Sequence, residues 1–222
     1  MATSSSKNFE PDVAEYIEEA FERCGIELRT GYDLKSATRS LNIMLAEWAN
    51  RGLNQWTVIE KTVDIDSTNS TAPIDVLDVF IRETTGSETI DIPLSRLSRA
   101  EYSHVTNKST TGKPNQYFVN KQLSPTVTVY PVPDLSSKYT LHMNVLTRMD
   151  DADSATNTMD LPFRFYPCLT AGLAYYMSMK RAPQLTGQLK AIYEEEFDRA
   201  LSTDEERSSF HISPNLRSYN NA

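Results

Sequence analysis

The stretch SATRSLNIMLAEWANRGLNQW, Ser36–Trp56, sets the frame around which the rest of the 222-residue chain must be arranged. Apolar residues recur in and just before it at every third or fourth position, which predicts an amphipathic helix. Asp33 can cap its start, and Gly52 is expected to end it. The stretch contains no reactive side chain, so we expect it to serve in packing the core. The predicted apolar stripe consists of Leu34, Ala37, Leu41, Met44, Leu45 and Trp48.

A second helix is predicted immediately before this one. Pro11 suits the first helical position, and Asp12 and Glu15 would lie at the positive end of the helix dipole. Gly25 supplies a left-handed stop. The segment IELRTGY then connects the two helices into an antiparallel hairpin. The apolar residues of the first helix are Val13, Ile17, Ala20, Phe21 and Cys24.

From Trp56 onward the apolar period changes from helical to two, which predicts strands. Turn signals about every ten residues favour an antiparallel sheet, with a short helix or turn at SRLSRAEYSHV and a loop at TNKSTTGKPNQ. The clearest strand is YTLHMNVLTRM, with His142 on its exposed face and Met143 on its buried face. The other predicted strands are residues 59–65, 76–84 and 89–95, YFVNKQ and TVTVYPVP.

Two further helices are predicted toward the C-terminus, after an acidic loop, DDADSATNTMD. LPFRFYPCLTAGLAYYMSMKRA is apolar on nearly all sides and should be buried, with Pro167 in its first turn and Pro183 at its end. The last helix, about residues 185–206, has a narrower stripe, and consecutive Glu194, Glu195 and Glu196 should be solvated. That stripe is Leu185, Leu189, Ile192, Phe197 and Leu201.

This order predicts an α+β protein in which N- and C-terminal helix pairs form one bundle around an inserted antiparallel β region. The expected domains are a discontinuous helical domain (8–54 plus 160–206), a β domain (55–150) and an extended tail (207–222). The tail is too polar to fold alone and either frays or orders on a partner. Its candidate docking residues are Phe210, Ile212, Leu216, Arg217 and Tyr219.

Composition excludes several classes of protein. Lys and Arg number 22 against 30 Asp and Glu, giving a net charge of −8, which argues against a surface that neutralises nucleic-acid phosphates. Cys24 and Cys168 fall in apolar helical patterns and are expected to be buried free thiols. No signal-peptide pattern opens the chain, and the longest apolar run, residues 166–179, is too short for a bilayer. We therefore expect a soluble cytoplasmic product.

No motif predicts catalysis, a metal or a cofactor. STTGKP lacks the P-loop residues, since Asn107 and Pro114 stand where Gly and Ser or Thr are needed. DDADS lacks the Gly and Glu of a calcium loop, since Ala155 and Leu161 stand there. The three histidines, His104, His142 and His211, are not at metal-ligand spacing. The sequence thus predicts a protein that is not an enzyme.

Two segments resemble the head-to-tail adaptors of short-tailed bacteriophages, the tail tubular protein A or tail accessory factor group. SLNIMLAEWANRGLNQWTV is similar to that family's second helix and the strand after it. LPFRFYPCLTAGLAYYMSMKRAPQL is similar to its Leu-Pro segment and buried Ala-rich helix. The order of elements also agrees over roughly residues 10–206. The matching positions of the first segment are Ala37, Leu41, Asn42, Leu45, Trp48, Arg51, Gly52 and Trp56.

The resemblance implies a ring, expected to hold twelve copies, docked between the portal protein and the tail nozzle of the virion. DNA would pass through without specific binding, and no membrane is involved. The tail would dock on portal or on a neighbouring subunit. Another neck or tail-completion protein, or a non-enzymatic binding module, stays open. The expected core of the helical frame is Leu41, Leu45, Trp48, Leu169, Leu173 and Met177.

Overall fold

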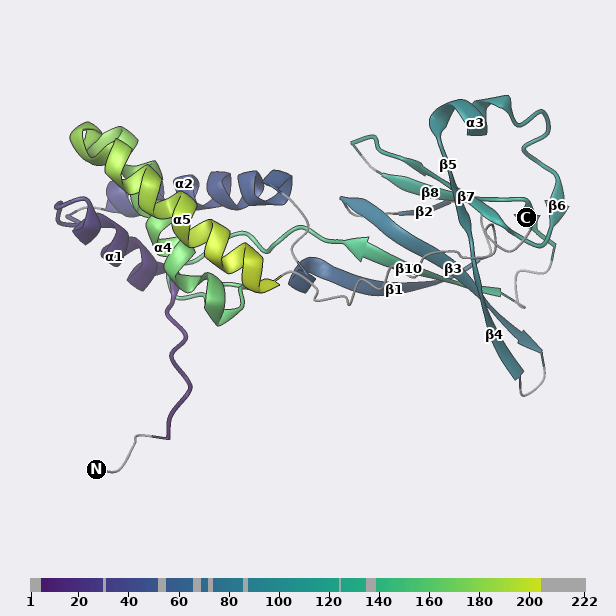
Figure 1. Ribbon diagram of the computed structural model, residues 1–222, viewed down its shortest axis with the longest axis horizontal. Helices are drawn as coiled ribbons and strands as arrows, with labels where there is room; N and C mark the ends of the chain where they lie inside the picture. The colour runs from purple at the N-terminus through teal and green to yellow at the C-terminus, as the bar shows by residue number, and fades with distance from the viewer. Residues whose placement is uncertain are drawn as a thin grey trace, which may run out of the picture.

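The computed structural model describes residues 5–29, 31–51, 55–65, 69–71, 74–85, 88–123, 125–134 and 139–204. The molecule is elongated, with the long helices gathered at one end and the β-sheets, together with one short helix, at the other (Figure 1). Each end has a hydrophobic cluster of its own, one built from helical residues and the other from strands. The predicted α+β class, with helices at both ends of the chain and a β region between them, is confirmed.

The first two helices are α1, Val13–Arg23, and α2, Gly31–Arg51. Asp12 caps α1 by accepting a hydrogen bond from the Glu15 backbone, and the Glu15 side chain accepts one from Asp12. The prediction that Pro11 is the first residue of the helix is therefore wrong, because Pro11 precedes the cap. Gly25 ends the helical segment with φ of +68°, a conformation that favours glycine.

The predicted cap of α2 is wrong. Asp33 is the third residue of α2, so its backbone is already helical. Its carboxylate instead accepts a hydrogen bond from Arg181, near the end of another helix. At the other end α2 runs to Arg51, and Gly52 lies outside the described residues.

The C-terminal helices are α4, Tyr166–Arg181, and α5, Thr186–Asp204. Short 3₁₀ turns precede them, η3 (Phe163–Phe165) and η4 (Pro183–Leu185). Pro167 lies in the first turn of α4 and Pro183 follows its end, as predicted. In α5 the buried stripe runs through Leu189, Tyr193 and Phe197, whereas Ile192 is 39% exposed, so its predicted place in the stripe is wrong.

Helix α4 is the central helix, and α1, α2 and α5 pack around it (Figure 1). Contacts along its length show that α1 runs parallel to α4, whereas α2 and α5 run antiparallel to it. The helices α1 and α2 are therefore antiparallel to each other, as the hairpin requires. The contacts are Tyr16–Tyr166 and Cys24–Ala174 for α1, Trp48–Phe165 and Ser40–Lys180 for α2, and Ser178–Thr186 and Arg164–Asp204 for α5.

In the described part of the β end, two four-stranded sheets pack against each other. The first has the order β1 (Val58–Asp64), β10 (Tyr139–Leu146), β3 (Asp75–Thr85), β4 (Glu88–Pro93). The second has the order β2 (Asn69–Thr71), β8 (Thr126–Tyr130), β7 (Gln116–Asn120), β5 (Ser95–Leu97). The short elements are η1 (Gln55–Thr57), α3 (Arg99–His104), β6 (Thr111–Gly112) and β9 (Val132–Pro133).

The first sheet is antiparallel throughout, whereas two other pairings, β5 with β7 and β6 with β9, are parallel and were not predicted. Both sheets direct apolar side chains such as Met143 and Val129 into a shared core. His142 points to the other face but is only 5% exposed, so its predicted solvent exposure is wrong. Its ring stacks on Phe80 at 4.9 Å, and its Nδ1 lies 2.7 Å from the Glu60 carboxylate.

The close approach of α2 and α5 to α4 depends on Gly172. A Cβ at this position would lie 2.5 Å from Met44 Sδ and 2.7 Å from the Tyr193 ring. Overpacking costs about 1–3 kcal/mol, against a helix-propensity gain of about 1 kcal/mol for alanine. We expect Gly172→Ala to lower the free energy of unfolding in denaturant titration by up to about 2 kcal/mol, as the balance of these two effects.

Gly187→Ala is the matched control, because nothing lies within 4 Å of a Cβ at Gly187 in α5. This variant should be as stable as the wild type or more stable, by up to about 1 kcal/mol. Equal stability of the two variants would show that α4 is not closely enclosed by its neighbours.

Candidate functional site

The described cysteines and histidines do not form a reactive centre. Burial raises the pKa of the Cys168 thiol, and also that of Cys24, whose Sγ–H donates to the Ala174 carbonyl over 3.3 Å. Both thiols are free and buried, as predicted, and their raised pKa disfavours the thiolate that a nucleophile needs. His104 is exposed at the end of α3 and not in a turn, and His211 lies outside the described residues.

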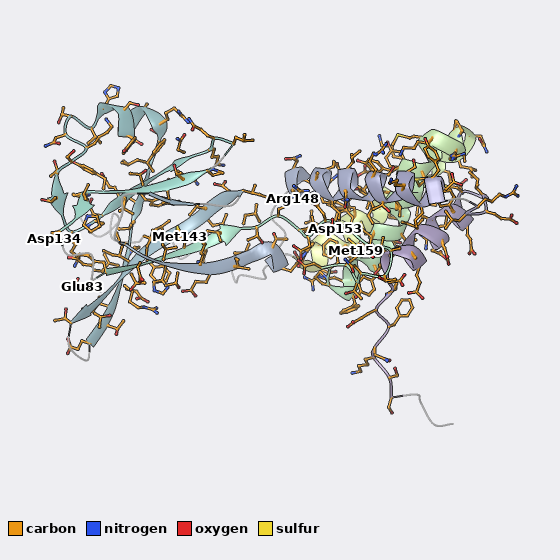
Figure 2. All side chains as sticks on the ribbon, turned by 180° about the vertical axis from the view of Figure 1, so that it is seen from behind. Glu83, Asp134, Met143, Arg148, Asp153 and Met159 are labelled. Atoms are coloured by element: carbon orange, nitrogen blue, oxygen red, sulfur yellow. The ribbon has the colours of Figure 1, made fainter. Side chains whose placement is uncertain are left out.

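The acidic loop after β10 is a structural connector between the β end and the helices. Asn42 of α2 binds the loop through two hydrogen bonds to the Ala152 backbone. The Asn42 Oδ1 accepts from the Ala152 amide over 2.8 Å, and the Asn42 Nδ2 donates to the Ala152 carbonyl. The first amides of α1 also bind the loop, Val13 donating to Asn157 and Ala14 to Ala155. Figure 2 shows Arg148, Asp153 and Met159 along this connection, next to the helices.

The same loop exposes its carboxylates while its backbone is held. Asp150, Asp151 and Asp153 are exposed, whereas Ala152 between them is 3% exposed. Among the described residues no group of three or more His, Cys, Asp or Glu side chains is placed to hold a metal ion. The binding of this loop's backbone to α1 and α2 was not predicted from the sequence.

The six residues proposed as the core of the helical frame all lie in the helical cluster. Each is at most 4% exposed, and Trp48 is fully buried with its ring 5.8 Å from Phe165 and 5.6 Å from Phe197. These aromatic contacts join α2, η3 and α5 in one packed unit. The six are Leu41, Leu45, Trp48, Leu169, Leu173 and Met177.

A chain of polar contacts crosses this frame and links α2 to α5. The Trp48 indole N–H donates to the Tyr193 hydroxyl over 2.7 Å, which donates to Glu47 over 3.2 Å. Arg51 donates to Glu47 and, through both terminal nitrogens, to Glu194 at 2.7 and 3.0 Å. A bidentate pair of this kind fixes orientation as well as distance.

Arg51 is the centre of this contact chain. The hydrogen bond to Glu194 raises the pKa of the guanidinium and lowers the pKa of the Glu194 carboxyl. The guanidinium carbon also lies 4.9 Å from the Tyr193 ring centroid and 4.7 Å from that of Phe197. Glu194 is therefore bound by Arg51, although its side chain stays 40% exposed to solvent.

The exit of the chain from α5 is fixed by a second ion pair. Asp204, the last residue of α5, is 7% exposed and accepts a hydrogen bond from Arg164 in η3. The guanidinium carbon of Arg164 lies 6.0 Å from the ring of Trp56, the aromatic residue that precedes β1. The proposed tail residues Phe210, Ile212, Leu216, Arg217 and Tyr219 lie outside the described residues.

The family model described as SU10 adaptor protein matches residues 11–218. The chain belongs to this family. Proteins of this family are structural phage proteins that act as head–tail adaptors, and this SU10 adaptor is one of them. No curated protein matches the chain.

The contacts of Asn42 and Arg51 explain the helix motif of this SU10 adaptor in physical terms. Asn42 and Arg51 lie in the motif beside the apolar stripe, and their side chains bind the acidic loop and α5. Their partners are 110 and 143 residues away in sequence. Within the described ranges, every helix is too short or too polar to span a membrane.

Tyr193→Phe tests the polar chain across the frame. The substitution keeps the buried ring but leaves the Trp48 N–H without its acceptor, which costs about 1–3 kcal/mol for a buried donor. We expect urea unfolding to show a loss of stability of that size.

Tyr175→Phe is the matched control. The Tyr175 ring stacks on Tyr193 at 5.9 Å, but its hydroxyl makes no hydrogen bond to any described residue. Its removal should change stability by less than about 0.5 kcal/mol. An equal loss in the two variants would mean that the Trp48–Tyr193 hydrogen bond does not stabilise the frame.

Proposed function

We propose that this SU10 adaptor forms the ring that joins the portal protein to the tail nozzle of a short-tailed phage, in the virion neck. The observation that carries the proposal is the family match over residues 11–218, which spans both ends of an elongated molecule. A connector must bind different proteins above and below, and two separately packed ends can do so. In this proposal the helical end and the β end act as separate domains.

A ring of about twelve copies requires contacts that join two different surfaces of the protomer. Such heterologous contacts close into a ring when the rotation between neighbours divides a full turn. The helical end is suited to this role because α1, α2 and α5 pack on α4, and Arg51 of α2 binds Glu194 of α5. The copy number itself comes from the resemblance to short-tailed phage adaptors.

The channel through the ring is proposed to let DNA slide without being gripped. A basic lining would bind phosphates and release counterions, which would hold the genome in place. The net charge of −8 supports the opposite arrangement, with a lumen that repels phosphate. The proposed binding partners are therefore proteins, and DNA passes through the ring without being bound.

The C-terminal tail, residues 207–222, is proposed to bind portal or a neighbouring subunit. It begins three residues after Asp204, the point where Arg164 fixes the end of α5. Phe210, Ile212, Leu216 and Tyr219 are spaced apolar anchors in an otherwise polar segment, with Arg217 between the last two. A segment of this composition gains order by binding.

Heads made without this protein test the function. We expect a phage lacking the gene to accumulate DNA-filled heads without tails, and purified protein added to these heads to restore tail attachment in electron micrographs. Tails that join the heads in its absence would exclude the adaptor function.

The same heads test the tail. A chain lacking residues 208–222 should keep the wild-type circular dichroism melt, because the deletion starts beyond α5, yet fail to bind portal. Deletion of residues 2–8, which precede α1, is the matched control and should leave attachment intact. Normal attachment by the shortened chain would rule out a docking role for the tail.

A further inference from the structure

The outward side of α2 carries an exposed stripe with a basic centre. Its members recur every three or four residues, so they lie along one side of the helix. Lys35 and Arg39 are one turn apart, about 6 Å along the axis. Neither forms an ion pair with any described residue, and Tyr32 and Ile43 beside them are 73% and 54% exposed. The stripe is Tyr32, Lys35, Arg39, Ile43, Ala46 and Asn50.

Positive charge gathers on this side although the chain is acidic overall. Lys180, at the end of α4, donates to the Ser40 hydroxyl of α2 over 2.6 Å. Burial, together with the nearby charges of Arg39 and Arg181, lowers the pKa of Lys180. The basic groups of α2 and α4 therefore lie close enough to repel one another, and a carboxylate partner would relieve that repulsion.

The outward side of α1 has the opposite charge with the same spacing. Glu18 and Glu22 are exposed, one turn apart, and form no ion pair with the described residues. Their neighbours are already engaged, since Glu19 pairs with Arg23 and Glu15 binds the Asp12 backbone. The two unpaired carboxylates thus match the two unpaired cations of α2 in number and separation.

An apolar groove lies beside the acidic side of α1. It has a volume of about 410 Å³, and its apolar lining comes from Phe9, Tyr16 of α1, and Tyr166 and Pro167 of α4. Charged residues of α1 complete its wall, namely Glu15, Glu19 and Arg23. Phe9 is 76% exposed, and the buried Tyr16 hydroxyl has no hydrogen-bond partner among the described residues. The α1 side therefore offers carboxylates next to an apolar surface, and the α2 side offers cations next to Ile43.

We propose that neighbouring copies in the ring meet through these two sides, with Lys35 and Arg39 of one copy facing Glu18 and Glu22 of the next. Ile43 and the groove beside Tyr16 are buried in the same contact. The proposal rests on the ring of the proposed function and names its interface. The two sides belong to different helices, both packed on α4, so the contact is heterologous, as ring closure requires.

A second copy of this chain fits these observations better than DNA does. DNA would satisfy the cations of α2 but would be repelled by the carboxylates of α1. A copy of the same chain satisfies both sides at once, and it covers the exposed apolar residues next to each. Complementary charge at the rim of an apolar contact also selects the correct orientation of the partner.

Charge reversal on each side tests the interface. One variant carries Glu18→Lys and Glu22→Lys, the other Lys35→Glu and Arg39→Glu. All four positions are exposed, and the new charges at Glu22 and Lys35 suit the dipole at the end of α1 and the start of α2, so both variants should fold. Mixed with portal, each variant alone should form at least about tenfold fewer rings than wild type in electron micrographs, because like charges then face each other.

An equal mixture of the two variants should restore rings with alternating copies. The basic α1 of one variant then meets the acidic α2 of the other, and the remaining contacts have the wild-type charges. Rescue by mixing would show that the defect of each variant lies in the contact, since a misfolded chain is not repaired by a second misfolded chain.

The control for added charge is Glu195→Lys with Asp198→Lys on the exposed side of α5, which raises the net charge as much as Glu18→Lys with Glu22→Lys does and also removes the exposed Glu195–Arg199 ion pair. Its rings should form as in wild type. Normal rings from either reversed variant alone, or a mixture without rescue, overturn the interface while leaving the adaptor function standing. If only the variant with Lys35→Glu and Arg39→Glu loses rings, Lys35 and Arg39 bind portal or DNA, and this result also overturns the interface. Absence of rings with wild-type protein would overturn the ring and the interface together.

Discussion

The enclosure of α4 by three other helices is the constraint on which the helical end depends. Seven consecutive residues, Cys168–Ala174, are buried, and seven residues cover every side of a helix. A helix buried all round must have neighbours on all sides, and here they come from both ends of the chain. The β end is accordingly placed between two segments that must meet.

The polar contacts then fix how these segments meet. Apolar burial supplies most of the stability but is not directional, so it alone would allow the helices to slide. Arg51 bound to Glu194, Trp48 bound to Tyr193 and Arg164 bound to Asp204 give α5 one position against α2 and η3. Asn42 does the same for the loop that returns from the β end.

The helices were predicted correctly because the residue patterns that indicate them are local in the sequence. The apolar spacing of three or four residues along α2, the apolar residues on nearly all sides of α4 and the glycine at position 25 depend on neighbours in the chain, and these helices are present as predicted. The failures depend on distant partners. His142 alternates as an exposed residue should, but Phe80 and Glu60 from adjacent strands cover it. The parallel pairing of β5 with β7 also joins segments about twenty residues apart, which alternation cannot reveal.

Of the candidate site, only the apolar core of the helical frame could be predicted from the sequence. The six apolar residues follow from periodicity, whereas Asp33, Asn42 and Arg51 are polar residues whose partners lie far along the chain. Ile192 and Tyr193 are adjacent and both fall near the stripe, and only the packing of Tyr193 against Gly172 and Trp48 distinguishes them.

We propose that the helical end and the β end bind different neighbours in one ring. A cryo-electron microscopy map of the intact virion neck tests this proposal most directly. We expect a closed ring into which this protomer fits, with its helical end and its β end at different levels of the channel axis and against different proteins. A map in which both ends contact the same neighbour, or in which this chain forms no closed ring, would contradict it.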